Sequence, residues 1–299
     1  MTNIKWNTNN IADQNNRVVI ITGATSGLGK EATKILAGKN AIVIMAVRNA
    51  EKGERVAAEF KKASPNAKID VRKLDLSSLS SVKSFAEGIN TSYDRLDILI
   101  NNAGVMACPF SKTEDDFEIQ MGTNHLGHFA LTGLLMPLLK KTKASRIVAT
   151  SSIAHRQGDI NFEDINWAKR KYVTGKAYGD SKLANLYFAY ELARKLKDDP
   201  SAPMVTAAHP GWTSTDLQRH SLMFRILNPI FSQNVDQGVL PTLRAATDEN
   251  AKPGDYYGPS GFMEAKGSPI VVKSNEMSHN ENNAKRLWDL SEKMTGIQF

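Results

Sequence analysis

Short apolar runs alternate with longer stretches of helical spacing along most of the chain. The runs predict buried strands at Arg17–Thr22, Ala41–Ala46, Ile69–Leu74, Leu96–Asn101, Arg146–Thr150 and Met204–Ala208. The helical spacing covers Gly29–Leu36, Ala50–Lys62, Ser78–Ile89, Asp116–Leu139 and Tyr178–Lys197. Strands that alternate with helices in this way predict an α/β fold, a doubly wound parallel sheet with helices on both faces.

The two ends of the chain depart from this alternation. Residues 1–16 are polar and rich in asparagine, and we expect a loose N-terminal arm ahead of a single domain at 17–299. After Pro210 the pattern changes to a mixture of Met, Phe, Leu and polar residues, which we expect to form a substrate loop at about 212–235. Tyr256-Tyr257 predicts a last strand, and Glu281–Met294 predicts a closing helix.

Composition narrows the class of protein. The 299 residues carry a formal charge of +7 and are 41% hydrophobic, which excludes a mainly disordered chain and allows a sizeable core. A single cysteine, Cys108, excludes an internal disulfide framework and most cysteine-rich metal sites. The sequence contains no apolar run of the roughly 18 residues that a membrane span needs and no apolar signal core. We therefore expect a cytoplasmic protein without a membrane span.

The positive charge raises the question of an anionic partner. The basic residues are scattered, with acids between them, whereas a nucleic-acid site needs a basic stripe with aromatic stacking partners. His125 and His128 stand three apart on one predicted helix, but the pattern offers too few further ligands for a metal, so we expect core packing there. We expect no nucleic acid and no metal, and the charge points to a small anion.

A glycine-rich segment, Thr22 to Lys30, runs directly from the first predicted strand into the first helix. Glycines here allow a tight turn and let backbone N–H groups approach a pyrophosphate at the helix N-terminus. The alternative is a glycine-rich turn without a ligand, but the strand–turn–helix context of a nucleotide site is met. The segment predicts a dinucleotide site of the Rossmann type, formed by Gly23, Thr25, Ser26, Gly27, Leu28 and Gly29.

The ends of the next two strands indicate which dinucleotide binds. NAD sites usually place an acid about 20 residues after the glycine turn, whereas NADP sites can place an arginine there. The second strand ends at Arg48 with no acid at its tip, and a guanidinium suits a 2′-phosphate. We therefore expect NADP(H) to be favoured over NAD(H). Asp75 and Leu76 follow the third strand, where adenine would lie, although Asp75 is also placed to cap a helix.

Polar motifs follow the remaining strands. Tyr178 and Lys182 stand four apart on a predicted helix and share one face. A nearby ammonium and a positively charged nicotinamide would lower the pKa of the tyrosine and suit it to acid–base catalysis near neutral pH. The other motifs stand at the carboxyl edge, where doubly wound sheets bind ligands; they are Ser151-Ser152, Asn101-Asn102-Ala103-Gly104 and His209-Pro210-Gly211.

These motifs resemble those of the short-chain dehydrogenase/reductase family over nearly the whole chain. The resemblance implies a catalytic tetrad of Asn124, Ser152, Tyr178 and Lys182, with Ser152 preferred to Ser151 because the family motif uses the second serine. It implies that Asn102 steadies the central strand, and that further cofactor contacts come from Asn102, Ala103, Gly104, Pro210, Gly211, Thr213 and Thr215. Three stretches resemble the retinol-dehydrogenase-like and protochlorophyllide-reductase-like branch: Ala46–Asn49, Asn124–Phe129 and Ser181–Asn185.

The resemblance implies reversible hydride transfer between NADP(H) and a carbonyl or alcohol. Tyr178 would exchange the proton, Ser152 would stabilise the oxyanion, Lys182 would bind the nicotinamide ribose, and Asn124 would hold a water linked to Lys182. Six residues lie in segments that either line a substrate pocket or pack as ordinary loops: Val105, Met106, His155, Trp212, Met223 and Phe224. If they line a pocket, their composition suggests an apolar or aromatic substrate.

Several alternatives stay beside this hypothesis. An insert at about 158–175 either covers the substrate mouth or obstructs the helix pair by which many relatives assemble, so monomer and homodimer are both open. A Ser–His hydrolase is disfavoured because no Gly-x-Ser-x-Gly elbow surrounds Ser152. A silent dinucleotide-sensing scaffold typically lacks the Tyr or Lys, and both are present here. A pigment reductase shares these residues but depends on a pigment pocket.

Overall fold

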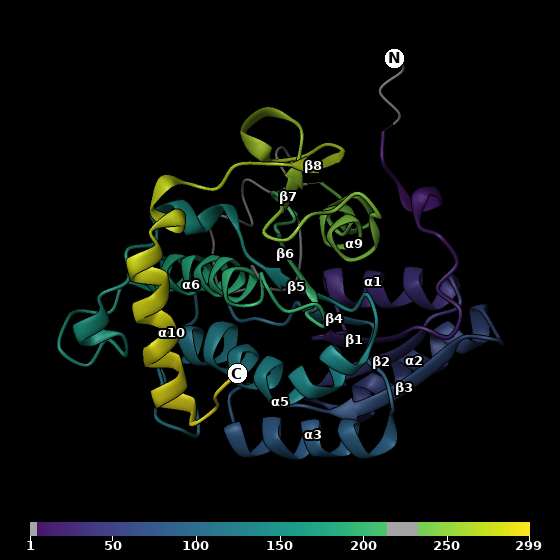
Figure 1. Cartoon of the computed structure of the whole chain (residues 1–299), viewed down its shortest axis with the longest axis horizontal. Coiled ribbons are helices and arrows are strands. Elements are labelled where there is room, and N and C mark those ends of the chain that lie inside the picture. The colour runs from purple at the N-terminus through teal and green to yellow at the C-terminus, as the bar shows by residue number, and fades with distance from the viewer. Residues whose placement is uncertain (1–4, 214–232) are drawn as a thin grey trace.

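The computed structural model describes residues 5–213 and 233–299, which are built around one eight-stranded sheet (Figure 1). Its strands follow the order β3-β2-β1-β4-β5-β6-β7-β8, and all neighbours are parallel except β7 and β8. The chain reverses direction across the sheet between β1 and β4, the switch point where such folds bind ligands. The strands are β1 (Val18–Thr22), β2 (Ile42–Val47), β3 (Lys68–Lys73), β4 (Ile98–Asn101), β5 (Arg146–Thr150), β6 (Met204–Ala208), β7 (Tyr256–Pro259) and β8 (Pro269–Val271).

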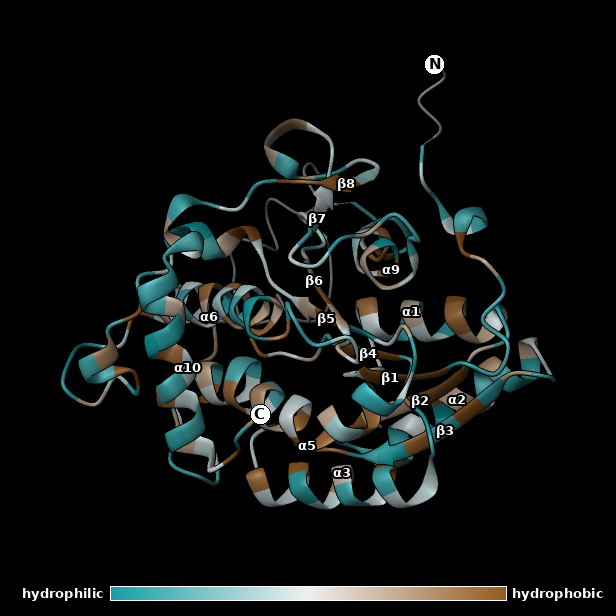
Figure 2. Ribbon diagram, in the orientation of Figure 1, coloured by the Kyte–Doolittle hydropathy of each residue, from teal (hydrophilic) through white to brown (hydrophobic). Residues whose placement is uncertain are grey.

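Helices cover both faces, so the predicted doubly wound Rossmann fold is confirmed. One core, which includes Leu36, Val56 and Leu243, packs α1, α2 and α9 on one face. The other, which includes Phe85, Leu135 and Leu186, packs α3, α5 and α6 on the opposite face. The central strands between them are hydrophobic, and much of the outward helix surface is hydrophilic (Figure 2). The helices are α1 (Gly27–Gly38), α2 (Ala50–Ala63), α3 (Leu79–Ser92), α4 (Ile119–Met121), α5 (Gly127–Lys141), α6 (Thr174–Lys195), α8 (Val235–Gly238), α9 (Leu240–Thr247) and α10 (Glu281–Thr295).

Local chemistry sets the ends of these elements. Strand β1 is buried along its whole length because both faces are covered, which explains its unbroken apolar run. Asn49 caps α2 by accepting a hydrogen bond from the Lys52 backbone N–H. Helix α4 begins at Ile119 and not at the expected Asp116, because Asp116 has a left-handed φ of 64°. In the described part of the chain, no helix combines the length and apolar character needed to cross a membrane.

Two further expectations need correction. The strand predicted at Tyr256-Tyr257 is not the last, since the short antiparallel β8 pairs with β7. The N-terminal arm is not loose over its described part: Ile11 is 2% exposed and belongs to a core cluster, and the Gln14 N–H donates to the Lys39 carbonyl. Ile11 and the partly buried Trp6 both pack against this core and fix the arm.

Candidate active site

The glycine turn after β1 is shaped by close backbone approach. Gly23 and Gly27 have φ angles of 69° and 51°, which side chains rarely adopt. A Cβ at Gly29 would lie 2.4 Å from the Gly23 carbonyl oxygen, and one at Gly23 would lie 3.0 Å from the Ala103 Cα. The turn is therefore packed tightly against the segment that follows β4.

Thr22 joins this turn to the Asn-Asn-Ala-Gly motif. Its hydroxyl oxygen accepts hydrogen bonds from the backbone N–H groups of Asn102 and Ala103, each at 2.9 Å. The Asn102 side-chain amide donates to the Thr22 carbonyl at 2.8 Å. These bonds fix the ends of β1 and β4 together at the switch point, which is the arrangement expected of Asn102.

The start of α1 fits an anionic group. Ser26 is its N-cap residue, in an extended conformation, yet the Ser26 side chain forms no capping hydrogen bond. Residues 25–28 are partly exposed, and the first N–H groups of a helix have no partner within that helix. The residues present are those that a pyrophosphate needs.

The polar residues that follow β2 and β3 differ in how far the protein itself already hydrogen-bonds or pairs them. Arg48 is exposed, and no acid forms an ion pair with it within residues 5–213 and 233–299. Asp75 is partly committed, because its Oδ1 accepts from the backbone N–H and the hydroxyl of Ser77 at 2.9 and 2.6 Å. Ser78 caps α3, and Leu76 is buried against Gly127.

Tyr178 and Lys182 lie one turn apart on α6, which begins at Thr174, a turn earlier than expected. The Lys182 Nζ lies 5.6 Å from the centroid of the Tyr178 ring and donates to the Thr150 carbonyl at the end of β5, at 3.2 Å. Both side chains are buried, at 9% and 3% exposure. Helix α6 thus holds the pair over the carboxyl end of β5.

The two serines after β5 point to different partners. The Ser151 hydroxyl donates to the Lys182 carbonyl at 2.8 Å and is buried. Ser152 caps the short helix η3 (Ile153–Gln157), where its hydroxyl accepts from the Ala154 N–H at 3.2 Å, and its side chain lies close enough to Tyr178 to lower the pKa of that phenol. The structure therefore brings Ser152, and not Ser151, together with the tyrosine hydroxyl.

Asn124 lies in a π-helical turn, η2 (Gly122–Leu126), and is fully buried. Such turns often mark functional sites. Its amide clamps Val105 through the Val105 N–H at 2.8 Å and carbonyl at 3.0 Å, and also donates to the Ser181 hydroxyl at 2.9 Å. Both ends of the Asn124 side-chain amide are thus engaged by the protein.

His128 connects this asparagine to the glycine turn. Its Nδ1 donates to the Asn124 carbonyl at 3.0 Å, so its Nε2 accepts from the Thr22 hydroxyl at 2.9 Å. His125 hydrogen-bonds Ser291, so the two histidines serve the core as expected. The link through Thr22 was missed, although the i, i+4 spacing of Asn124 and His128 is its sequence signal.

Burial dominates the proton affinities of the pair on α6. It raises the pKa of Tyr178 to about 12, and the neighbouring Ser152 side chain opposes this only in part. Burial also lowers the pKa of Lys182 to about 8. In the protein alone, burial therefore outweighs the neighbouring ammonium and the phenol stays protonated at neutral pH, whereas the lowering expected from the ammonium together with a bound nicotinamide stays a prediction.

The turn after β6 is well ordered by its own contacts. Gly211 has a φ of 66°, and a Cβ there would lie 2.5 Å from the Ala265 carbonyl oxygen. The Thr213 hydroxyl donates to the Pro210 carbonyl at 2.7 Å, and the Trp212 N–H donates to the Ala265 carbonyl at 2.8 Å. Three predicted site residues lie outside the described residues: Thr215, Met223 and Phe224.

The expected substrate residues that are described play unequal parts. Val105 is partly exposed and held by Asn124, whereas Met106 is 9% exposed. His155 is fully buried: its Nδ1 donates to the Ser152 carbonyl at 2.6 Å and its Nε2 accepts from the Asn275 N–H at 3.3 Å. Both ring nitrogens are occupied, so we correct the expectation that His155 contacts substrate.

The insert at 158–175 is tied to the segment that follows β4. Its Tyr172 hydroxyl donates to Glu118 at 2.7 Å and accepts from the Gln120 amide at 2.8 Å. The Thr174 hydroxyl donates to the Cys108 carbonyl at 3.1 Å. The outer side of α6 is instead covered by α10 (Figure 1). The insert therefore stands against the Val105–Cys108 segment.

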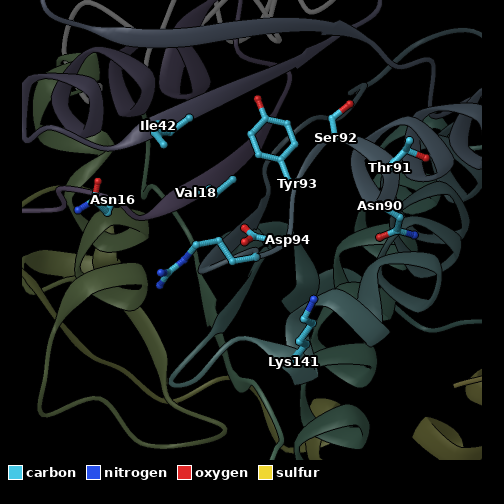
Figure 3. Close-up of a pocket in the computed structure, with 10 residues that line it drawn as sticks. Asn16, Val18, Ile42, Asn90, Thr91, Ser92, Tyr93, Asp94 and Lys141 are labelled. Carbon is cyan, nitrogen blue, oxygen red and sulfur yellow. The ribbon is translucent and has the colours of Figure 1, made fainter.

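A hollow of about 610 Å³ lies at the opposite, amino edge of the sheet (Figure 3). It includes Val18 and Ile42, the first residues of β1 and β2, together with the end of α3. None of the predicted catalytic or cofactor residues lines it. The motifs and this hollow thus occupy opposite edges.

Comparison with known proteins agrees with this geometry. Residues 17–223 match the family model for short chain dehydrogenases. The chain belongs to the short-chain dehydrogenase family. It is 42% identical to retinol dehydrogenase 12 of Mus musculus, covering 95% of this chain and 87% of that protein, and 42% identical to retinol dehydrogenase 11 of Homo sapiens, covering 94% and 86%. It therefore falls in the retinol-dehydrogenase-like branch.

Solved structures show the same relationship. An uncharacterized protein from Mycobacterium paratuberculosis matches with a TM-score of 0.83 at 40% identity, over 99% of both chains. A short chain dehydrogenase from Shigella flexneri 2a, solved with NADP, matches with a TM-score of 0.65 at 28% identity, over 82% of this chain and 97% of that one. This short-chain dehydrogenase is therefore an oxidoreductase of a family that uses nicotinamide cofactors.

Proposed function

We propose that this short-chain dehydrogenase transfers hydride between NADP(H) and an apolar or aromatic carbonyl or alcohol, with Tyr178 as general acid and base. The observation that carries the proposal is the meeting of Tyr178, Ser152, Lys182 and Asn124 beside the glycine turn, at the carboxyl edge of the sheet. The similarity to retinol dehydrogenases supports an apolar substrate.

The chain offers matching groups for the cofactor. The glycine turn and the uncapped start of α1 would hold the pyrophosphate, and Arg48 would hold the 2′-phosphate. When bound, the nicotinamide would supply or accept the hydride. Preference for NADP(H) rests on Arg48, and relatives solved with NADP and NADPH are consistent with it.

The side chains account for the proton. With a pKa of about 12, Tyr178 is protonated at neutral pH, so it is ready to donate its phenolic proton to an alkoxide as hydride reaches the carbonyl carbon. Ser152, whose side chain lies beside the same hydroxyl, would stabilise the developing charge on the oxygen. The Lys182 ammonium would favour the resulting phenolate. The geometry thus suits carbonyl reduction near neutral pH.

The decisive experiment removes one hydroxyl. Tyr178→Phe should lower NADPH-dependent turnover of a carbonyl panel by about 10²–10⁴-fold, the usual contribution of an acid–base residue, while NADPH binding followed by fluorescence is retained. Tyr187→Phe is the matched control, since Tyr187 is a buried tyrosine on the same helix. Undiminished turnover in Tyr178→Phe would refute the proposal.

The same assay separates the alternatives. A sensing scaffold would bind NADPH without oxidising it in the presence of any carbonyl. A pigment reductase would need illumination and pigment for turnover. Dark turnover with simple aldehydes, ketones or retinoids excludes both.

A further inference from the structure

A hydrogen-bonded bridge that runs from the buried His209 to the exposed Arg156 joins the turns that follow β6 and β5. Glu264, in the short helix η6 (Phe262–Glu264), accepts from His209 Nε2 at 2.8 Å and from the Arg156 guanidinium at 2.7 Å. His209 directly follows β6 and precedes Pro210 and Gly211, whereas Arg156 belongs to η3, the helix that Ser152 caps. One carboxylate therefore contacts both the turn after β6 and the turn after β5.

The contacts of His209 define its protonation state. Its Nδ1 accepts from the Gly211 N–H at 3.2 Å, so the ring proton of the neutral form is on Nε2, where it is donated to Glu264. The ring is fully buried against β7, and a Cβ at Gly258 would lie 2.1 Å from Nε2. A second proton on Nδ1 would place two donors face to face and release Gly211.

The backbone at Glu264 is held in an unfavourable conformation. Met263 and Glu264 have φ angles of 52° and 55°, in the left-handed region that side chains disfavour. Such conformations persist when the surroundings determine them, and they gather at functional sites. The contacts to His209 and Arg156 supply that determination here.

We infer that Glu264 is a positioning residue that, through His209 and Arg156, fixes the Pro210–Gly211 turn against the helix that carries Ser152. This rests on the proposed function, since it gives Ser152 and that turn a common task. His155, the other histidine beside Tyr256, holds the Ser152 carbonyl from the opposite side. The carboxylate would keep the tyrosine's partner and the cofactor turn in register during turnover.

The charged groups around His209 predict the direction in which its pKa shifts when each of them is replaced. His209 faces Glu264, Arg156, His155 and Tyr256. Burial lowers the pKa of His209, Glu264 raises it and Arg156 lowers it. Glu264→Gln should therefore move the titration of His209 to lower pH, and Arg156→Gln should move it to higher pH. Because removing either charge shifts the pKa of His209 by electrostatics alone, the pH–rate profiles must move with the resonance for the bridge to act on turnover.

The experiment follows both turnover and the histidine itself. In Glu264→Gln, kcat for carbonyl reduction near pH 7.5 should fall on the order of tenfold, since small displacements of catalytic groups are costly. Because a second proton on His209 would release Gly211, the acid limb of the pH–rate profile should follow the titration of His209. The limb should move to lower pH in Glu264→Gln and to higher pH in Arg156→Gln. Glu163→Gln is the matched control, because Glu163 pairs with Arg286 on the surface away from this bridge.

A histidine NMR titration needs no turnover and keeps the two proposals distinguishable. Opposite shifts of the His209 resonance, matched by the pH–rate profiles, support the bridge. Unchanged or parallel shifts of that resonance overturn it, as do opposite resonance shifts with unmoved profiles. If wild type had no turnover, the proposed function would fail, and the bridge would be judged on the pH dependence of NADPH binding in the same variants.

Discussion

At the amino edge of the sheet, Asp97 finds its hydrogen-bond partners within the protein. At the carboxyl edge, Arg48 has no acidic partner among the described residues and the start of α1 has no side-chain cap. Asp97 is 2% exposed and accepts from the Val18 N–H at 2.9 Å and from both ends of the Arg95 guanidinium at 2.8 and 2.7 Å. Arg48 has no acid partner in the described ranges, and Ser26 makes no side-chain cap. Polar groups satisfied internally build the fold, and those left open are available to a ligand.

The hollow in Figure 3 lies at the amino edge, away from the sequence motifs. Several charged residues line it, yet one of them, Arg95, is already paired with Asp97. At the carboxyl edge, Ser152 and Lys182 lie beside Tyr178 instead. Chemistry, and not the size of a cavity, separates the two edges.

The two serines after β5 give the strongest test of the difference between a group bonded within the fold and a group available to a ligand. Ser152→Ala should lower turnover by about 10²–10³-fold, the cost of losing one oxyanion donor, and should lose roughly 1 kcal/mol of stability with the N-cap of η3. Ser151→Ala removes a bond to a helix carbonyl, so it should cost roughly 1 kcal/mol of stability and leave turnover of the folded protein nearly intact. Kinetics and thermal unfolding of both variants decide this, and equal kinetic losses would contradict the assignment.

The amino edge should show the reverse pattern. Asp97→Ala leaves the buried Val18 N–H without its acceptor and breaks the pair with Arg95, whose half-exposed side chain can still be hydrated. We expect a loss of about 2–3 kcal/mol in the free energy of unfolding, measured by urea titration. The kcat of the folded enzyme should stay within twofold of wild type. A large fall in kcat at full folding would show that the amino edge takes part in function.

Arg48 tests whether an open charge at the carboxyl edge binds cofactor. Arg48→Ala should raise the Kd for NADPH by roughly 10–30-fold, since charge-assisted hydrogen bonds contribute about 1.5–2 kcal/mol at an exposed site, and should leave the Kd for NADH unchanged. Arg55→Ala, an exposed arginine on α2, is the control. Equal weakening of both cofactors would show that Arg48 does not select the 2′-phosphate.

The sequence allowed much of this edge to be predicted, because the relevant signals are local. Strand β5 was predicted to its exact bounds, and the glycine turn, Tyr178 and Lys182 were placed by motif and spacing. The predictions failed where the outcome depends on contacts between distant segments. Strand β8 is a short, half-exposed partner of β7, and Ile11 is buried only because the sheet lies beneath it.

The candidate site shows the same division. Motif matching identified Asn124, but not that its amide is occupied by Val105 and Ser181. His155 looked accessible from its place beside Ser152, whereas its burial follows from β7 and the Asn275 segment. The pKa of Tyr178 could not be predicted from its spacing to Lys182, because burial depends on the whole packed environment.

The smallest expected effect concerns the charge on Lys182. Its pKa of about 8 means that the ammonium is present at pH 7 and lost as the pH rises, whereas Tyr178, with a pKa of about 12, stays protonated throughout. If the ammonium is needed, kcat for reduction should halve near pH 8 and fall about tenfold by pH 9. Lys182→Arg keeps its charge over this range, so its profile should be flatter, at a lower overall rate. A wild-type profile that stays level to pH 9.5 would show that cofactor binding restores the lysine's usual pKa, and that burial at this edge is relieved when the site is filled.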